Sequence, residues 1–151
     1  MKLAESLRPQ CVKVPMASTD KAGAIRELVD LLAKAGIVSD AQHVYDAVLE
    51  RESRRSTGIG MGLAVPHAKT SAVNRLVMAV GKPADPIDFD SRDNQPVSLI
   101  VLLISPPEQT GAHIQALATI SRLITVPHVR TAIEQARQAE ELYRIITQQD
   151  A

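Results

Sequence analysis

The sequence predicts an α/β or α+β sandwich, in which helices cover a β-sheet. Apolar residues recur with a helical period in several segments, and short runs of branched apolar residues that are typical of strands lie between them. Of the 151 residues, 45% are hydrophobic and 23% are charged, a composition that can build a core. No repeat or linker divides the chain, so we expect residues 1–151 to form a single domain.

The segment between Ser18 and Gly36 predicts an amphipathic helix. Its apolar stripe follows the 3.6-residue period and consists of Ile25, Leu28, Val29, Leu32 and Ala35. Ser18 or Thr19 can cap the first turn, because a hydroxyl accepts a hydrogen bond from a free backbone N–H. Gly36 is the expected stop.

A second helix is predicted to begin after Ser39 or Asp40. Its inner stripe consists of Ala41, Val44, Tyr45 and Val48. When that stripe is continued by three and four residues from Val48, it arrives at Arg51 and Glu52. Two charged side chains therefore end a face that is otherwise buried.

Three short apolar runs bounded by Gly, Pro or Asn predict strands, namely Leu63–Val65, Leu76–Val80 and Val97–Ile104. A third amphipathic helix is predicted over Gln109–Thr125, with Thr110 as its cap. Val129–Thr147 predicts one or two closing helices. Residues 1 to about 6 and 149–151 are expected to be peripheral.

Charge and composition exclude several classes of protein. Lys plus Arg and Asp plus Glu both number 17, so no net positive charge attracts nucleic acid. The most continuous apolar stretch, Val97–Ile104, is far shorter than the roughly 20 residues of a membrane helix, so we expect no membrane insertion. The single cysteine, Cys11, and the lack of a long apolar segment near the N-terminus favour the cytoplasm.

Glycines occupy alternate positions in Ser56–Gly62, directly before a predicted strand. Such spacing permits a tight turn and lets backbone N–H groups approach an anion. The run is neither a dinucleotide fingerprint, which would follow a strand and open a helix, nor a P-loop, which needs Gly-Lys-Ser/Thr. An ordinary glycine-rich turn into a strand fits it equally well.

His67 follows Pro66, and proline restricts the backbone at this strand exit to extended conformations. A neutral imidazole has a nucleophilic nitrogen at cellular pH, which attack on phosphorus requires. A lone histidine is more often an ordinary core or surface residue, so the interpretation of His67 as a phosphoryl acceptor depends on its neighbours.

Two neighbours support a phosphoryl site. His113 lies in the first turn of the third helix, where the positive end of the helix favours anions and a neutral imidazole, and its stripe should face inward. Arg51 offers a guanidinium for phosphoryl oxygens. A core histidine and an exposed ion-paired arginine are the alternatives for these two residues.

Other kinds of site fit poorly. One cysteine and no His-x-x-x-His pair argue against a metal site. Hydrolysis by Ser56 or Thr57 with His67 would need a Gly-x-Ser-x-Gly elbow, which the sequence lacks. His43 and His128 are expected to be solvated or capping residues.

Five blocks of the sequence together resemble the enzyme IIA components of the bacterial phosphotransferase system, of the fructose/mannitol and nitrogen-related type. The blocks are Arg51-Glu52, Ser56–His67, Asp93–Val97, Pro107–His113 and Glu140–Ile146. They span roughly residues 51–147 and look closest to the nitrogen-related members. The resemblance implies an α/β sandwich with a mixed central sheet between helices. Met61 is a small variation within the glycine-rich block.

The resemblance also implies a phosphocarrier whose active histidine, His67, receives phosphate from an HPr-like protein on Nε2. His113 would donate a hydrogen bond to the phosphate or orient the ring, and Arg51 would clamp the charge. No cofactor or metal is implied. Such a protein is a component of a phosphotransferase relay and not a stand-alone enzyme of many turnovers.

The phosphate has two possible uses. The first is regulation of partner proteins by phosphorylation state in the nitrogen-related branch. The second is donation to a fructose- or mannitol-type sugar permease. A lone domain without a fused module, and the similarity of the later blocks to nitrogen-type members, favour the first.

Overall fold

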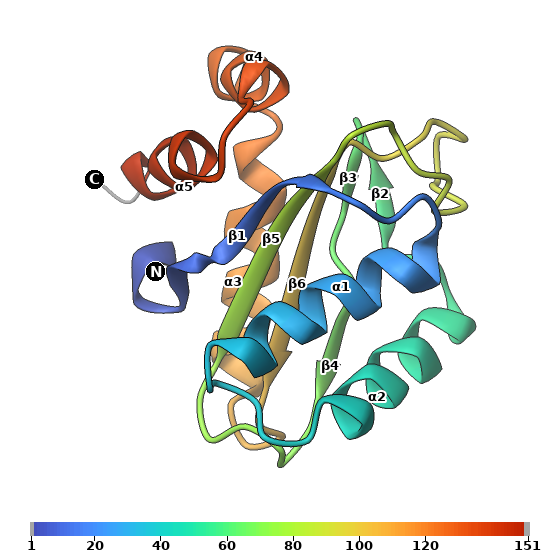
Figure 1. Ribbon diagram of the computed structural model, residues 1–151, viewed down its shortest axis with the longest axis vertical. Coiled ribbons are helices and arrows are strands. Elements are labelled where there is room, and N and C mark those ends of the chain that lie inside the picture. The colour runs from blue at the N-terminus through green and yellow to red at the C-terminus, as the bar shows by residue number, and fades with distance from the viewer. Residues whose placement is uncertain (1, 150–151) are drawn as a thin grey trace.

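The computed structural model describes residues 2–149 and shows a β-sheet between two layers of helices (Figure 1). In chain order the elements are η1 (Leu3–Glu5), β1 (Leu7–Met16), α1 (Lys21–Lys34), α2 (Ala41–Arg54), β2 (Gly58–Gly60), β3 (Leu63–Ala64), β4 (His67–Lys69), β5 (Val77–Pro83), β6 (Leu99–Ser105), α3 (Thr110–Leu123), α4 (Pro127–Gln135) and α5 (Ala139–Gln148). The predicted α/β sandwich is confirmed.

The sheet is mixed, with the strand order β1-β5-β6-β3-β2, and β4 also pairs with β6. β6 runs antiparallel to β5 and parallel to β3 and β4. All seven residues of β6 are buried. A strand buried on both faces reads as a continuous apolar run, which is why the sequence predicted it well.

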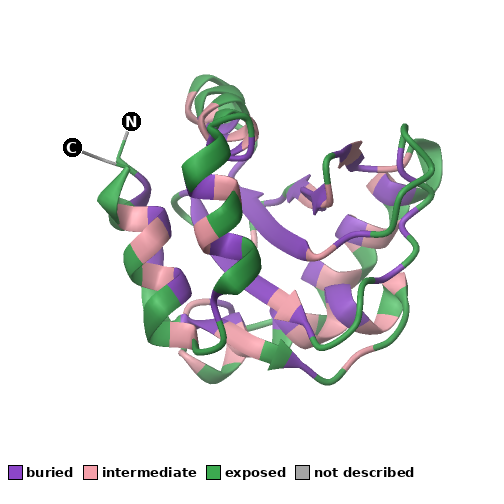
Figure 2. Cartoon of the chain, turned by 90° about the horizontal axis from the view of Figure 1, so that it is seen from above, coloured by how far each residue is buried: buried purple, intermediate pink, exposed green. Residues whose placement is uncertain are grey.

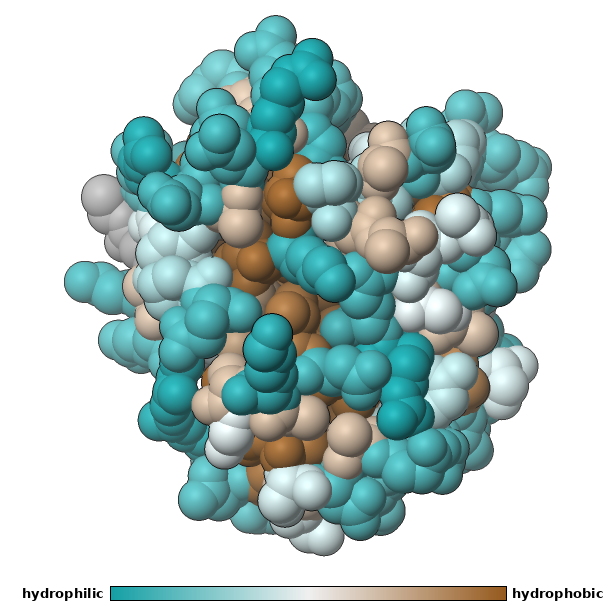
Figure 3. All heavy atoms as spheres, viewed as in Figure 1, coloured by the Kyte–Doolittle hydropathy of each residue, from teal (hydrophilic) through white to brown (hydrophobic). Residues whose placement is uncertain are grey.

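Helices cover both faces of the sheet. α1 and α2 lie in front of the strands in Figure 1 and α3 lies behind them, while α5 packs against β1. Viewed from above in Figure 2, the buried residues of these helices face the strands. Figure 3 shows hydrophobic side chains in a strip down the middle of one face, surrounded by hydrophilic ones. None of the helices within residues 2–149 has the length and apolar character to cross a membrane.

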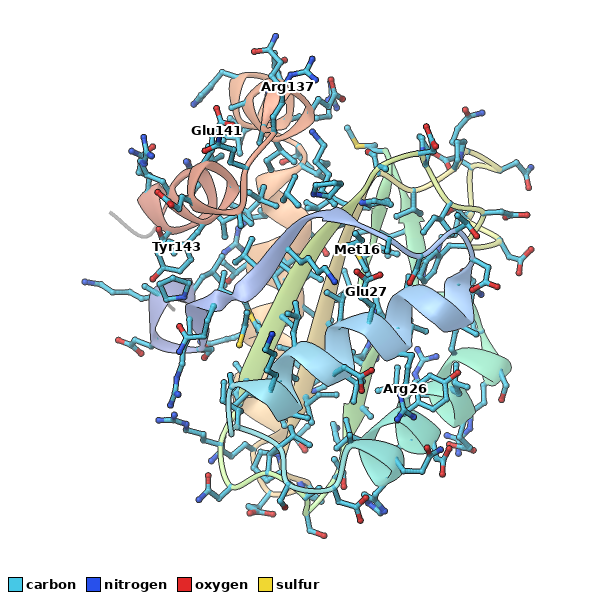
Figure 4. All side chains as sticks on the ribbon, in the orientation of Figure 1. Met16, Arg26, Glu27, Arg137, Glu141 and Tyr143 are labelled. Atoms are coloured by element: carbon cyan, nitrogen blue, oxygen red, sulfur yellow. The ribbon has the colours of Figure 1, made fainter. Side chains whose placement is uncertain are left out.

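The cap of α1 differs from the prediction. Asp20 is the N-cap, and its carboxylate accepts a hydrogen bond of 2.7 Å from the Gly23 N–H. Ser18 does not cap, because its hydroxyl donates to Glu27 at 2.6 Å. Figure 4 shows Glu27 reaching from α1 toward the end of β1 near Met16. There it also accepts the backbone N–H of Ser18 at 2.9 Å, so Glu27 fixes the connection between β1 and α1.

The other helix ends agree in part. Asp40 caps α2 by accepting the His43 N–H at 3.1 Å, as predicted. The predicted cap of the third helix is wrong, because Gln109 is the N-cap of α3 and the Thr110 hydroxyl donates to the Pro107 carbonyl instead. The closing segment forms two helices, α4 and α5.

The sequence pattern missed β1. Pro9 and Pro15 lie within this strand, and proline lacks the N–H that a central strand needs, so the segment did not read as a strand. At the edge of the sheet both prolines are tolerated. Leu3 is 1% exposed, so the expectation that residues 1 to about 6 are peripheral is wrong there. Residues 1, 150 and 151 lie outside the described part of the chain.

The glycine-rich run forms the antiparallel hairpin of β2 and β3. Met61 and Gly62 occupy its turn with φ angles of 57° and 79°, the left-handed conformations that a tight hairpin turn requires. The Met61 N–H donates to the Asp93 carboxylate at 3.0 Å. The ordinary interpretation of this run as a turn into a strand is correct for Met61 and Gly62, but Gly58–Gly60 forms a strand that the sequence did not predict.

Replacing two glycines by alanine should change stability in opposite directions. Gly62→Ala places a Cβ 2.9 Å from the Ser98 hydroxyl oxygen at a positive φ and should lower the free energy of unfolding by about 1–2 kcal/mol. Gly111 lies in α3 with no atom near the new Cβ, so Gly111→Ala should raise it by roughly 0.5–1 kcal/mol. Urea denaturation measures both, and equal effects would contradict the turn assignment.

Candidate functional site

His67 is the first residue of β4, and backbone bonds to β6 hold it in place. The Leu103 N–H donates to the Pro66 carbonyl at 3.0 Å, and His67 pairs with Leu103 in the sheet. The imidazole Nδ1 lies 2.8 Å from the Val65 carbonyl oxygen. Because a carbonyl can only accept, Nδ1 carries the hydrogen and Nε2 of the neutral ring keeps its lone pair.

His113 lies beside His67, as the helical stripe predicted. The two ring centroids are 5.2 Å apart with an edge-on angle of 64°. His113 is 2% exposed, and its Nδ1 lies 2.6 Å from the hydroxyl oxygen of Ser105, the last residue of β6. Its backbone N–H is bonded to the Gln109 carbonyl, so His113 follows the free N–H groups of the first turn.

Both imidazoles are neutral at physiological pH. Burial lowers the pKa of His67 below its usual 6.5, the Val65 carbonyl opposes this, and the Arg51 charge lowers it further. Burial, with smaller contributions from His67 and Lys69, lowers the pKa of His113 to about 4. His67 Nε2 is therefore available as a nucleophile. When Ser105 donates to Nδ1 of His113, the other nitrogen of that ring is a hydrogen-bond donor.

His67 lies between two hollows. The larger, of about 530 Å³, is lined by Arg51, His67, Lys69 and His113, and by apolar side chains that include Ile114 and Leu117. The smaller, of about 260 Å³, is also lined by Arg51 and His67, together with Arg55 and Arg92. Arg51 thus lines both hollows, and its guanidinium donates to the Arg55 carbonyl at 3.1 Å.

The rim of these hollows is strongly cationic. It carries five basic residues, namely Arg51, Arg54, Lys69, Arg55 and Arg92. Among residues 2–149, Glu50 is the one acidic residue that lines either hollow, and it pairs with Arg54 at 2.6 Å. In a chain with 17 basic and 17 acidic residues, this local excess favours an anion at His67.

The structure brings together the three residues that the sequence singled out, since His67, His113 and Arg51 line one pocket. His43 and His128 are exposed, as expected, and His43 bonds to Thr70 at 2.9 Å. Within residues 2–149, no group of three or more His, Cys, Asp or Glu side chains is placed to hold a metal ion.

Lys69, Ser105 and Arg92 were missed. Lys69 had a usable signal, because residues two apart on a strand share a face, which puts Lys69 on the side of His67. Ser105 and Arg92 had none. A serine at a strand end and an arginine in a loop gain their place only from the way β6 and the loop after Phe89 fold against the site.

Residues 5–149 match the family described as phosphoenolpyruvate-dependent sugar phosphotransferase system, EIIA 2. The fructose-specific EIIABC component of Bacillus subtilis (strain 168) is 36% identical over 99% of this chain, which spans only 24% of that protein. A fructose-specific EIIA component from Haloferax volcanii is 36% identical over 85% of this chain and 83% of its own. The nitrogen regulatory protein of Escherichia coli (strain K12) is 34% identical over 97% of this chain and 90% of its own.

Solved structures show the same fold. The nitrogen regulatory protein IIA-Ntr from Neisseria meningitidis superposes with a TM-score of 0.88 and 28% identity, covering 96% of this chain and 99% of that one. IIA mannitol from Escherichia coli superposes with a TM-score of 0.77 and 20% identity, covering 93% of this chain and 99% of that one. The expectation of a mixed sheet between helices is confirmed.

The neutral state of His113 should make stability depend on pH. The folded pKa is about 4 and the usual pKa is 6.5, so between these values the unfolded chain binds more protons. The free energy of unfolding should therefore fall as the pH drops through this range, by at most about 1.4 kcal/mol per pH unit from this residue. His113→Asn, which keeps a polar partner for Ser105, should reduce the slope. Denaturation curves from pH 4 to 7 measure it, and an unchanged slope would contradict the assignment.

Proposed function

This chain belongs to the enzyme IIA type 2 family of the phosphoenolpyruvate-dependent sugar phosphotransferase system, and we propose on that basis that it is a phosphohistidine carrier whose acceptor is His67. One observation carries the proposal most directly. The Val65 carbonyl fixes the hydrogen on Nδ1 and leaves Nε2 free, inside a pocket rimmed by cations.

In the transfer, the Nε2 lone pair attacks the phosphorus of a donor phosphohistidine. The bond from Nε2 to phosphorus forms, the bond from phosphorus to the donor ring nitrogen breaks, and its electron pair returns to the donor imidazole. The His67 ring becomes more positive as Nε2 gives its pair, and the Val65 carbonyl at Nδ1 stabilises that charge. No proton has to leave His67.

The neighbours of His67 stabilise the phosphoryl group as it moves. Arg51 offers a planar fork of N–H donors to its oxygens, and Lys69 adds a second positive charge from the same strand as His67. His113 donates a hydrogen bond from a ring that stays neutral. Transfer of this kind depends mainly on positioning and charge stabilisation, which matches what these residues provide.

The donor we propose is an HPr-like phosphocarrier protein, and the use of the phosphate is regulatory. Relatives named nitrogen regulatory protein match this chain over nearly their full length, with 90% of the Escherichia coli protein covered. The superposition with IIA-Ntr is also better than that with IIA mannitol, at TM-scores of 0.88 and 0.77. We therefore expect phosphorylation of His67 to decide which partner proteins bind.

A second candidate function is donation of phosphate to a fructose-type sugar permease. The specific observation in its favour is the 36% identity to fructose-specific relatives, slightly above that to the nitrogen regulatory proteins. Both functions use the same His67 chemistry and differ in what receives the phosphate.

Substitution of the site residues tests the carrier function. A phosphoenolpyruvate-driven relay should add one acid-labile phosphate to the protein, and His67→Ala should abolish it. His113→Ala and Arg51→Ala should slow transfer on the order of 10²-fold, the usual effect of removing one donor to the charge of a transition state. Radiolabelled phosphate transfer measures the rates.

His128→Ala is the matched control, because His128 is exposed on α4 and lines neither hollow. It should transfer at the rate of the unaltered protein. Persistence of the label in His67→Ala would refute the acceptor, and full rates in both other variants would remove His113 and Arg51 from the site.

The two uses of the phosphate can be separated with membranes that contain a fructose- or mannitol-type permease. The regulatory function predicts that the phosphorylated protein keeps its label when sugar is added, because no permease domain accepts it. Sugar-dependent loss of the label, followed over time, would instead establish the permease function.

A further inference from the structure

We propose that Glu52 is a positioning residue, which holds the His67 imidazole through Thr57 and the backbone of Val65 and whose charge stabilises the positive form of the ring. The role in transfer rests on the proposed carrier function of His67. The role in fixing the ring rests on geometry alone, and the two can be tested separately.

A chain of hydrogen bonds links the two side chains. The Glu52 carboxylate accepts the Thr57 N–H at 2.6 Å and also the Thr57 hydroxyl. The Thr57 carbonyl accepts the Val65 N–H at 3.0 Å. The Val65 carbonyl accepts Nδ1–H of His67 at 2.8 Å. A buried carboxylate is thus connected to the reactive imidazole through hydrogen bonds at two residues, Thr57 and Val65.

Glu52 is buried where a charge is costly. It is 6% exposed, and its only ionic partner among the described residues is Lys21, at 3.6 Å. A buried carboxylate is retained where its hydrogen bonds replace water, and Thr57 supplies two of them. A neutral residue could fill the position at lower cost, which suggests that the charge itself has a use.

The first effect of Glu52 is on geometry. Arg51 and Glu52 are neighbours on α2, whereas Val65 and His67 belong to the segment that contains β3 and β4. Within this part of the site, Glu52 fastens the residues after α2 to the helix, and Thr57 then pairs with Val65. The carboxylate therefore holds against α2 the backbone whose Val65 carbonyl bonds the His67 ring.

The second effect is electrostatic. A negative charge near the imidazole stabilises the positive form of the ring, and the Glu52 charge raises the pKa of His67 in this way. The same charge stabilises the positive charge that the ring gains during transfer. Charged and titratable groups near the imidazole come from α2, β4, α3 and the segments after α2 and Phe89, and are Glu50, Arg51, Glu52, Arg54, Arg55, Lys69, His113 and Arg92. Of the two carboxylates, Glu50 is paired with Arg54 at 2.6 Å, and Glu52 is the one that raises the pKa of His67.

Two substitutions separate charge from shape. Glu52→Gln removes the charge but can still accept the Thr57 N–H at Oε1 and donate from Nε2 to the Thr57 hydroxyl oxygen, so we expect His67 to stay in the Nδ1–H form, to titrate at lower pH, and to accept phosphate roughly tenfold more slowly at saturating donor. Glu52→Ala removes the bonds as well, so a mixture of the two His67 tautomers should appear. Ring-nitrogen NMR across a pH titration reads the tautomer and the pKa.

Asp46→Asn is the matched control, because it removes one exposed carboxylate from the same helix and should change neither reading. If the unaltered protein accepts no phosphate, the carrier function fails, while the NMR comparison still decides what Glu52 does to the ring. The proposal would be overturned if His67 titrates at the same pH in Glu52→Gln as in the unaltered protein. It would also be overturned if Glu52→Gln accepts phosphate at the rate of the unaltered protein, where transfer occurs. Glu52→Gln retains the shape of the side chain. If Glu52→Ala fails to fold, the Glu52→Gln variant alone still decides the test.

Discussion

Burial of β6 is the constraint on which the rest of the structure depends. All seven of its residues are buried, so the strand needs cover on both faces and pairing along both edges. α1 and α2 cover one face and α3 the other, while β5 takes one edge and β3 and β4 share the second. The site lies where these requirements meet, because Ser105 ends β6, His67 opens β4, and His113 lies on the helix that covers them.

The neutral state of the site follows from the same packing. An imidazole surrounded by cations and apolar side chains loses its proton more easily than one in water, and both His67 and His113 lie in such surroundings. Neutral rings at a cationic rim suit an incoming phosphoryl group, since the rim attracts the anion and the ring offers a lone pair. The carbonyl of Val65 then decides which nitrogen offers it.

Sequence patterns predicted most of the core and singled out three residues that line one pocket, because these depend on periodicity and on residue type. α1, α2, α3 and the buried part of β6 follow such periods closely. The patterns failed where a distant contact outweighs a local preference. The Ser18 hydroxyl donates to Glu27 and therefore does not cap α1. β1 lies at the edge of the sheet, where prolines that would break an inner strand are tolerated. Ser105 and Arg92 enter the site through tertiary contacts alone, which no local period reports.

The rim around His67 gives phosphorylation a physical consequence beyond the transfer itself. In the described part of the chain, five basic residues and one carboxylate line the two hollows, so the free protein presents a positive surface there. A phosphoryl group on Nε2 would bring nearly two negative charges into this surface and offer acceptors to Arg51 and Lys69. The guanidinium and ammonium groups would then turn inward to the phosphate and leave less positive charge for a partner. Ile114, which is 59% exposed beside the pocket, would remain accessible in both states. A partner that contacts both the apolar side chain and the cations could thus distinguish the two forms by charge, without a change in fold.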